Sequence, residues 1–140
     1  MKLSLGLIAA ALAHGATIFS SGLPDGSAAV SISILRAAED FTIGAATITG
    51  VRFYIAANDP VIPNPQGNFS GQITYALYND AAGSLGTLLA TGTVSGLTSV
   101  PTGIVVNAVN AGISSVDFNL LTAVSAGAGT YWLEVHEGPT

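Results

Sequence analysis

The residues best suited to chemistry lie on the last predicted strand of the chain, from Thr130 to His136. Side chains alternate between the two faces of a strand, so Trp132, Glu134 and His136 share the face opposite the apolar residues between them. An aromatic plate can stack on the apolar face of a sugar ring, while neighbouring polar groups bond its hydroxyls. This row therefore predicts a carbohydrate-binding surface.

Two tyrosines extend this prediction. Tyr54 and Tyr78 both fall opposite the expected core faces of their strands and would enlarge the aromatic plate. The alternative is that Trp132 packs under a loop or against a further strand, because large aromatic side chains are highly buried on average. Both interpretations are open at the level of sequence.

Oxygen-bearing side chains offer a second kind of site. Glu39 with Asp40, and Asn79 with Asp80, are the best candidates for a structural calcium ion, which takes carboxylate and carbonyl oxygens from loops. Neither pair has the alternating Asp/Asn spacing of a dedicated calcium loop. The chain has no cysteine, so we expect no transition metal and no cofactor other than calcium.

Enzymatic chemistry finds little support in the sequence. Most of the eight acidic residues lie in turn-like contexts, which favours solvated turn residues over the facing pair that glycoside hydrolysis needs. His136 is the only histidine beyond the first 14 residues, and no Gly-x-Ser-x-Gly motif precedes it. We expect a protein that is not an enzyme.

The elements that must position these residues are short alternating strands. The clearest are two strands within Ser70–Ser95, joined by turn-forming residues from Asn79 to Gly86. The pattern places Ile73, Tyr75 and Leu77 on the core face of the first strand, and puts Leu88, Ala90 and Val94 on one face of the second, opposite Leu89, Thr91, Thr93 and Ser95.

Similar patterns recur along the chain. Further strands are predicted at Ala16–Phe19, Ser31–Leu35, Phe41–Ile43, Thr47–Ile55, Gly103–Val109, Ile113–Leu121 and Thr130–His136. We interpret Arg36–Asp40 as a connection and expect Val51, Phe53 and Ile55 to lie opposite Ile48, Arg52 and Tyr54. No amphipathic helix is evident, so the sequence predicts an all-β fold, an antiparallel β-sandwich or jelly roll.

The first residues are typical of a secretory signal peptide. Met1–Ala13 carries one lysine, a short apolar run and a small-x-small site, with cleavage expected after Ala13 or Ala16. Residues 1–16 are thus predicted to be a leader and 17–140 a single domain. The apolar run is shorter than the ~20 residues that span a bilayer, so we expect a secreted or cell-surface protein without a membrane span.

The charge of the chain limits its partners. Charged residues make up 8% of the sequence, against about 25% in an ordinary soluble domain. The net charge is −5, which argues against nucleic acid or anionic membranes because both need patches of Lys and Arg.

Several phrases together resemble the secreted bacterial surface proteins that carry a PEP-CTERM sorting tail. They are Ala38–Ile43, Ile48–Tyr54, Tyr75–Asp80, Leu88–Thr93 and Ala128–His136. The resemblance implies export, an extracellular β-sandwich and association with exopolysaccharide and biofilm matrix, and it transfers no catalytic residue. The chain departs from the pattern at His136–Thr140, where no Pro-Glu-Pro motif, apolar helix or basic cluster follows. We therefore expect a domain truncated at its C-terminus.

Three functions follow as expectations. The first is a non-catalytic protein with an adhesive or structural role in the exopolysaccharide or biofilm matrix. The second is a carbohydrate-binding module that uses the exposed aromatic face. The third is a subunit of an extracellular fibre, favoured by low charge and by edge strands that can pair between chains.

Overall fold

The computed structural model describes residues 8–9, 19–20, 36–56, 69–106 and 111–138. These residues form strands, and among them no helix is long and apolar enough to cross a membrane. The strands are β1 (Ile8–Ala9), β2 (Phe19–Ser20), β3 (Ala37–Ile43), β4 (Ala46–Ala56), β5 (Gln72–Asp80), β6 (Leu85–Ser95), β7 (Ser99–Val106), β8 (Ala111–Ala126) and β9 (Gly129–Glu137). The predicted strand at Ser31–Leu35 lies outside the described residues, as does that at Ala16–Phe19 except for Phe19.

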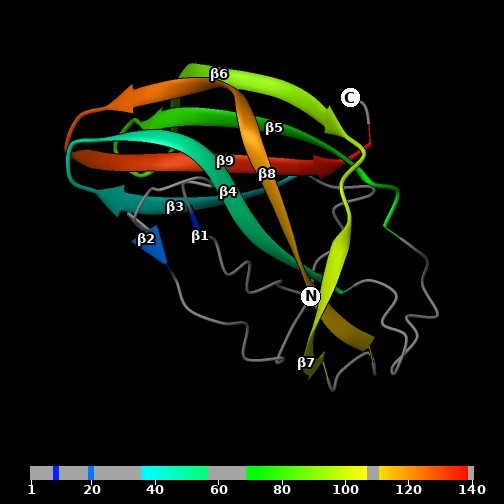
Figure 1. Cartoon of the computed structure of the whole chain (residues 1–140). Coiled ribbons are helices and arrows are strands. Elements are labelled where there is room, and N and C mark those ends of the chain that lie inside the picture. The colour runs from blue at the N-terminus through cyan, green and yellow to red at the C-terminus, as the bar shows by residue number, and fades with distance from the viewer. Residues whose placement is uncertain (1–7, 10–18, 21–35, 57–68, 107–110, 139–140) are drawn as a thin grey trace.

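The strands form two packed antiparallel sheets (Figure 1). The four-stranded sheet has the order β3-β9-β5-β6, and the five-stranded sheet has the order β2-β1-β4-β8-β7. This arrangement confirms the all-β, two-layer architecture. Ile8, within the predicted leader, pairs with Arg52 of β4.

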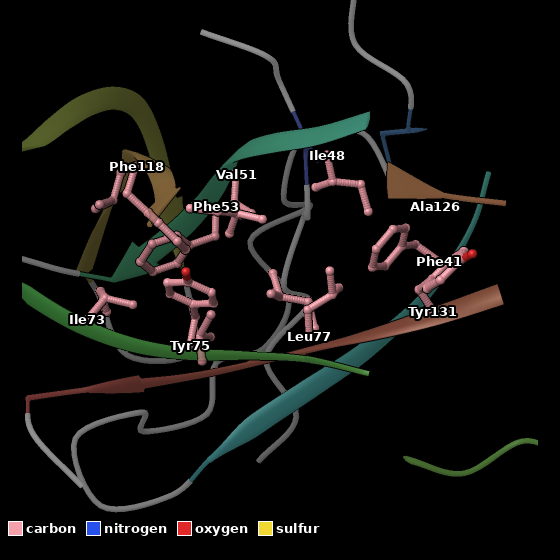
Figure 2. Packing of buried hydrophobic residues seen from close by; sticks show 14 of the residues in the cluster. Phe41, Ile48, Val51, Phe53, Ile73, Tyr75, Leu77, Phe118, Ala126 and Tyr131 are labelled. Carbon is pink, nitrogen blue, oxygen red and sulfur yellow. The ribbon is translucent and has the colours of Figure 1, made fainter. Parts of the chain in front are cut away.

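The core lies between the two sheets and is built from alternate residues of each strand. Figure 2 shows side chains from β4 and β8 meeting those from β3, β5 and β9. The rings of Phe53 and Tyr75 both pack against Phe118, at centroid distances of 6.1 and 5.4 Å. The predicted core faces of β4 and β5 are confirmed, since Val51, Phe53, Ile55, Ile73, Tyr75 and Leu77 all belong to this cluster.

Irregular pairing overturns two predicted orientations. Ile48 was expected opposite Val51, yet both lie in the core because the β4–β8 register shifts between Ile48 and Gly50. Leu88 was expected to share a face with Ala90, which packs against the core, but a shift after Leu77 places Leu88 opposite Tyr78, and it is 49% exposed. In β6 one extra residue, Leu89, reverses the alternation, whereas in the β4–β8 pair four residues of β8 (120–123) lie opposite Thr49 alone.

Three strand boundaries also differ from the prediction. The expected connection Arg36–Asp40 is wrong, because β3 starts at Ala37 and pairs with β9 from that residue onward. β8 continues to Ala126, since its end pairs with the start of β4. β7 begins at Ser99 and includes Pro101, which an edge strand tolerates.

Candidate functional site

The outer face of the four-stranded sheet collects the candidate binding residues into rows. Residues directly opposite each other in an antiparallel pair point to the same face. One row runs across all four strands: Asp40, Trp132, Tyr78 and Leu88. The next row is Ala38, Glu134, Ala76 and Thr91, and His136, Thr74 and Thr93 form a third across β9, β5 and β6.

The aromatic part of this face is held in place by a hydrogen bond. Trp132 and Tyr78 are register neighbours on β9 and β5, and both are half-buried. The indole Nε1 of Trp132 donates to Oδ1 of Asp80 at 2.8 Å. The N–H of Gly83 donates to the same carboxylate, and these bonds, the one from Trp132 first, lower the pKa of Asp80 below its ordinary value of 3.8. Asp80 thus fixes the orientation of the indole.

A shallow hollow lies beside this aromatic pair. Its volume is about 220 Å³, below the ~300–1,000 Å³ of typical small-molecule pockets. The residues that line it come from β5, β6 and β9 and from the start of β3: Arg36, Thr74, Tyr75, Ala76, Tyr78, Leu88, Thr91, Glu134 and His136. Such an open hollow fits part of an extended ligand better than a small molecule enclosed on all sides.

Charged groups at the hollow are partly paired. Arg36 donates to Oε1 of Glu134 at 3.1 Å, and the Arg36 side chain is 55% exposed whereas that of Glu134 is 13% exposed. Nδ1 of His136 is buried and has no hydrogen-bond partner within the described part of the chain. A buried polar group without a partner costs about 1–3 kcal/mol.

Hydroxyl groups continue the polar surface along β5 and β6. The Oγ1 atoms of Thr74 and Thr93 lie 2.9 Å apart, and Thr74 also donates to the carbonyl of Gly138. Nε2 of Gln72 donates to Oγ of Ser95 at 2.8 Å. This side of the face presents neutral donors and acceptors and no charge.

The structure brings together four of the five predicted binding residues. Trp132, Glu134, His136 and Tyr78 lie on one face of adjacent strands, as the alternation predicted. Tyr54 does not join them, because it lies on β4 in the other sheet and is only 4% exposed. The aromatic surface therefore consists of Trp132 and Tyr78.

The candidate calcium ligands have other partners or point apart. By alternation Glu39 lies on the inner side of β3 and Asp40 on the outer side. Asn79 Oδ1 accepts the N–H of Thr87, while Asp80 accepts the bonds described above. Within the described ranges no group of three or more His, Cys, Asp or Glu residues gathers where a metal ion could bind. Asn79 and Asp80 act here as acceptors that shape the β5–β6 hairpin.

Burial perturbs one of these carboxyls. Glu39 is half-buried at the edge of the sheet, and desolvation, helped by the neighbouring charge of Asp40, raises its pKa to about 6. The raised pKa follows from the inward position of Glu39, and the same position keeps its carboxyl away from the hollow.

Several residues of the hollow were not singled out from the sequence. They are Arg36, Thr74, Ala76, Leu88 and Thr91. Alternation within β5 and β6 already indicates that Thr74 and Thr91 face away from the core. What it could not indicate is the pairing of β5 with β9, which joins residues about 60 positions apart.

Comparisons of the chain with protein-family models, with curated proteins and with solved structures find no match. The geometry of the outer face is therefore the basis on which a function is inferred.

Proposed function

We propose that this chain is a non-catalytic protein of the cell surface or extracellular matrix that binds neutral polysaccharide on the outer face of its four-stranded sheet. The observation that carries the proposal is the row of Trp132, Tyr78 and Leu88 beside a hollow lined with hydroxyl and carboxylate groups. Stacking platforms next to hydrogen-bonding groups suit the alternating apolar and polar surfaces of sugar rings.

The charges at the site favour a neutral ligand. Arg36 is the cation among the lining residues, apart from a protonatable His136, and it is already paired with Glu134. An acidic sugar would have to compete with that carboxylate in a chain of net charge −5. A neutral sugar needs only hydroxyl contacts, which Thr74, Thr91 and Glu134 can supply.

Binding without catalysis also agrees with the composition of the hollow. Glycoside hydrolysis uses two carboxyl groups that flank the scissile bond. Among the residues that line the hollow, Glu134 is the one carboxylate. The resemblance to PEP-CTERM surface proteins and the signal peptide pattern support a location in the exopolysaccharide or biofilm matrix.

The test uses the single tryptophan of the chain as a probe, because Trp132 lies on the proposed face. We expect its fluorescence to change on titration with soluble neutral polysaccharides, such as galactomannan or dextran, and much less with alginate. Tyr78→Ala keeps the probe and should weaken binding at least tenfold, or about 1.4 kcal/mol.

Retardation in polysaccharide-containing gels provides a second measurement that does not need the probe. Trp132→Ala should migrate as it does without polysaccharide, while Val100→Ala, at a residue 58% exposed on the other sheet, should be retarded like the unchanged protein. Equal retardation of Trp132→Ala and the unchanged protein would refute the proposal. Circular dichroism of each variant verifies that the fold is kept.

A further inference from the structure

β6 is an edge strand that lacks the features by which the edge strands β3 and β7 avoid pairing with another chain. Within the described residues it pairs only with β5, so one row of its backbone donors and acceptors faces away from the sheet. Edge strands of soluble proteins are usually protected by charge, proline, bulges or an inward-pointing charged residue.

The opposite edge of the same sheet is protected by charge. β3 carries Glu39 and Asp40 in its centre, with Glu39 on the inner side of the strand. Its pairing with a second β3 would bring four carboxylates together. An inward-pointing charge at an edge is one of the known devices against such pairing.

One edge of the other sheet, β7, is protected by its backbone. β7 contains Pro101, which lacks an N–H, and its register with β8 shifts between Pro101 and Ile104. Gly103 within this stretch has a positive φ of 78°. A regular ladder cannot form along such a strand.

β6 has neither kind of protection over its second half. Leu85–Ser95 contains no charged residue and no proline. Irregular pairing is confined to its first half, and from Ala90 to Ser95 every residue pairs with β5 in unbroken register. Leu85, Leu88 and Leu89 of this strand are 42, 49 and 41% exposed. The uncharged and regular half from Ala90 to Ser95 is therefore suited to pairing with another strand, and the exposed leucines lie in the bulged half beside it.

We propose that β6 pairs antiparallel with β6 of a second copy of this chain, forming a two-fold dimer with one continuous eight-stranded sheet. The comparison of the edges favours pairing of β6 with β6, because neither strand then meets a charge. The assembly stops at two chains, since the remaining edge of each sheet is β3, which is protected by Glu39 and Asp40. The interface is one strand wide, below the ~1,200 Å² of standard interfaces. We therefore expect a weak dimer that forms only at high protein concentration.

Such a dimer would place two hollows on one face of a single sheet. That consequence rests on the proposed function, since two linked sites raise the overall affinity for a polymer without new contacts. The dimer itself does not rest on it. Sedimentation measures the mass of the protein and not its binding of polysaccharide, so the dimer and the proposed function can be refuted independently.

The test is sedimentation equilibrium of the protein from about 10 μM to 2 mM, a range chosen for weak association. We expect the average mass to rise with concentration from that of one chain, 13.9 kDa for the full sequence, toward twice that value, and to fit a monomer–dimer equilibrium. A mass that stays monomeric throughout would overturn the proposal. A mass that grows past twice that of one chain would also overturn it, because open pairing of β6 with β3 would then be the rule.

Substitutions locate the interface. Leu89→Lys puts a charge on the edge without altering a residue of the hollow, and it should remain monomeric; Leu85→Lys serves the same purpose if the first variant does not fold. Val100→Lys, a matched change on the edge strand β7, should dimerise normally. In the unchanged protein, amide exchange of residues 90–95 should slow at least threefold from 10 μM to 2 mM. Dimers formed by both Lys variants of β6, or exchange independent of concentration, would refute the pairing.

Discussion

The indole Nε1 of Trp132 donates a hydrogen bond to Oδ1 of Asp80 at 2.8 Å and so connects β9 to the hairpin between β5 and β6. Both oxygens of Asp80 also accept the N–H of Gly83, at 3.1 Å, within the turn that follows β5. One carboxylate therefore orients the aromatic surface and shapes the adjacent turn. The binding face and the hairpin are not independent structures.

Replacement of Asp80 should loosen the indole without unfolding the protein. In Asp80→Ala the N–H of Trp132 loses its acceptor, and we expect a shifted fluorescence emission and weaker polysaccharide binding, by about three- to tenfold for one hydrogen bond. Asp40→Ala removes an equally negative group that lies opposite Trp132 in register. If both variants lose the same affinity, charge and not the hydrogen bond is responsible.

The two sheets are joined by a hydrogen bond from the core. The hydroxyl of Tyr75, on β5, accepts the N–H of Leu121, on β8, at 2.9 Å. Tyr75 is 1% exposed, so Tyr75→Phe leaves that N–H without its partner at no change in packing. We expect a loss of about 1–2 kcal/mol in the free energy of unfolding by urea.

Tyr131→Phe is the matched control for this substitution. The Tyr131 hydroxyl donates to the carbonyl of Gly127, only four residues away at the turn between β8 and β9, so this bond does not join the two sheets. Its removal should cost less than about 0.5 kcal/mol. Equal losses in the two variants would contradict a special role for the bond between the sheets.

Local alternation was enough to anticipate the layers of this fold and most of the candidate site. It placed Trp132, Glu134 and His136 on one face of their strand, and Tyr78 on the outer face of its own. It could not show which strands are neighbours, and for that reason Tyr54 was grouped with residues that lie on the other sheet. Strand order depends on contacts between distant segments, which a period of two does not encode.

Bulges account for the errors inside single strands. Leu88 faces the hollow because β6 has an extra residue opposite β5, and Ile48 faces the core because the β4–β8 register shifts, with the excess residues in β8. β3 was missed over Ala37–Asp40 because its local sequence has little strand character, and pairing with β9 decides its conformation. In these cases tertiary context overrides the local pattern.

Gly86 in the β5–β6 hairpin lies so close to the backbone of Asn79 that a larger residue would clash there. A Cβ added at Gly86 would lie 2.7 Å from the backbone oxygen of Asn79, which cannot rotate away. We expect Gly86→Ala to lower the free energy of unfolding by about 1–3 kcal/mol. At Gly44 a Cβ would meet nothing within 4 Å, so Gly44→Ala should change stability by less than about 0.5 kcal/mol. Similar losses in both variants would show that the clash with Asn79 is not the cause of the loss at Gly86.

The inward carboxyl of β3 should make stability depend on pH. Burial, helped by the charge of Asp40, raises the pKa of Glu39 to about 6 in the folded protein from 4.5. Between these values the folded state binds more protons than the unfolded state, so stability falls as pH rises. The favourable contribution is complete below pH 4.5 and lost above about pH 6.

Glu39→Gln should remove this dependence and stabilise the protein at pH 7. The shift is equivalent to ~2 kcal/mol, and because the carboxyl is half-exposed, solvent screening reduces the gain to about 1 kcal/mol. Asp40→Asn removes only the minor cause, so it should keep most of the slope between pH 4.5 and 6. Urea unfolding at intervals across this range measures both. A Glu39→Gln variant with the slope of the unchanged protein would mean that another group titrates there. The loss of stability caused by ionised Glu39 at neutral pH has a counterpart at the edge of the sheet. An ionised carboxylate that points inward keeps β3 from pairing with another strand.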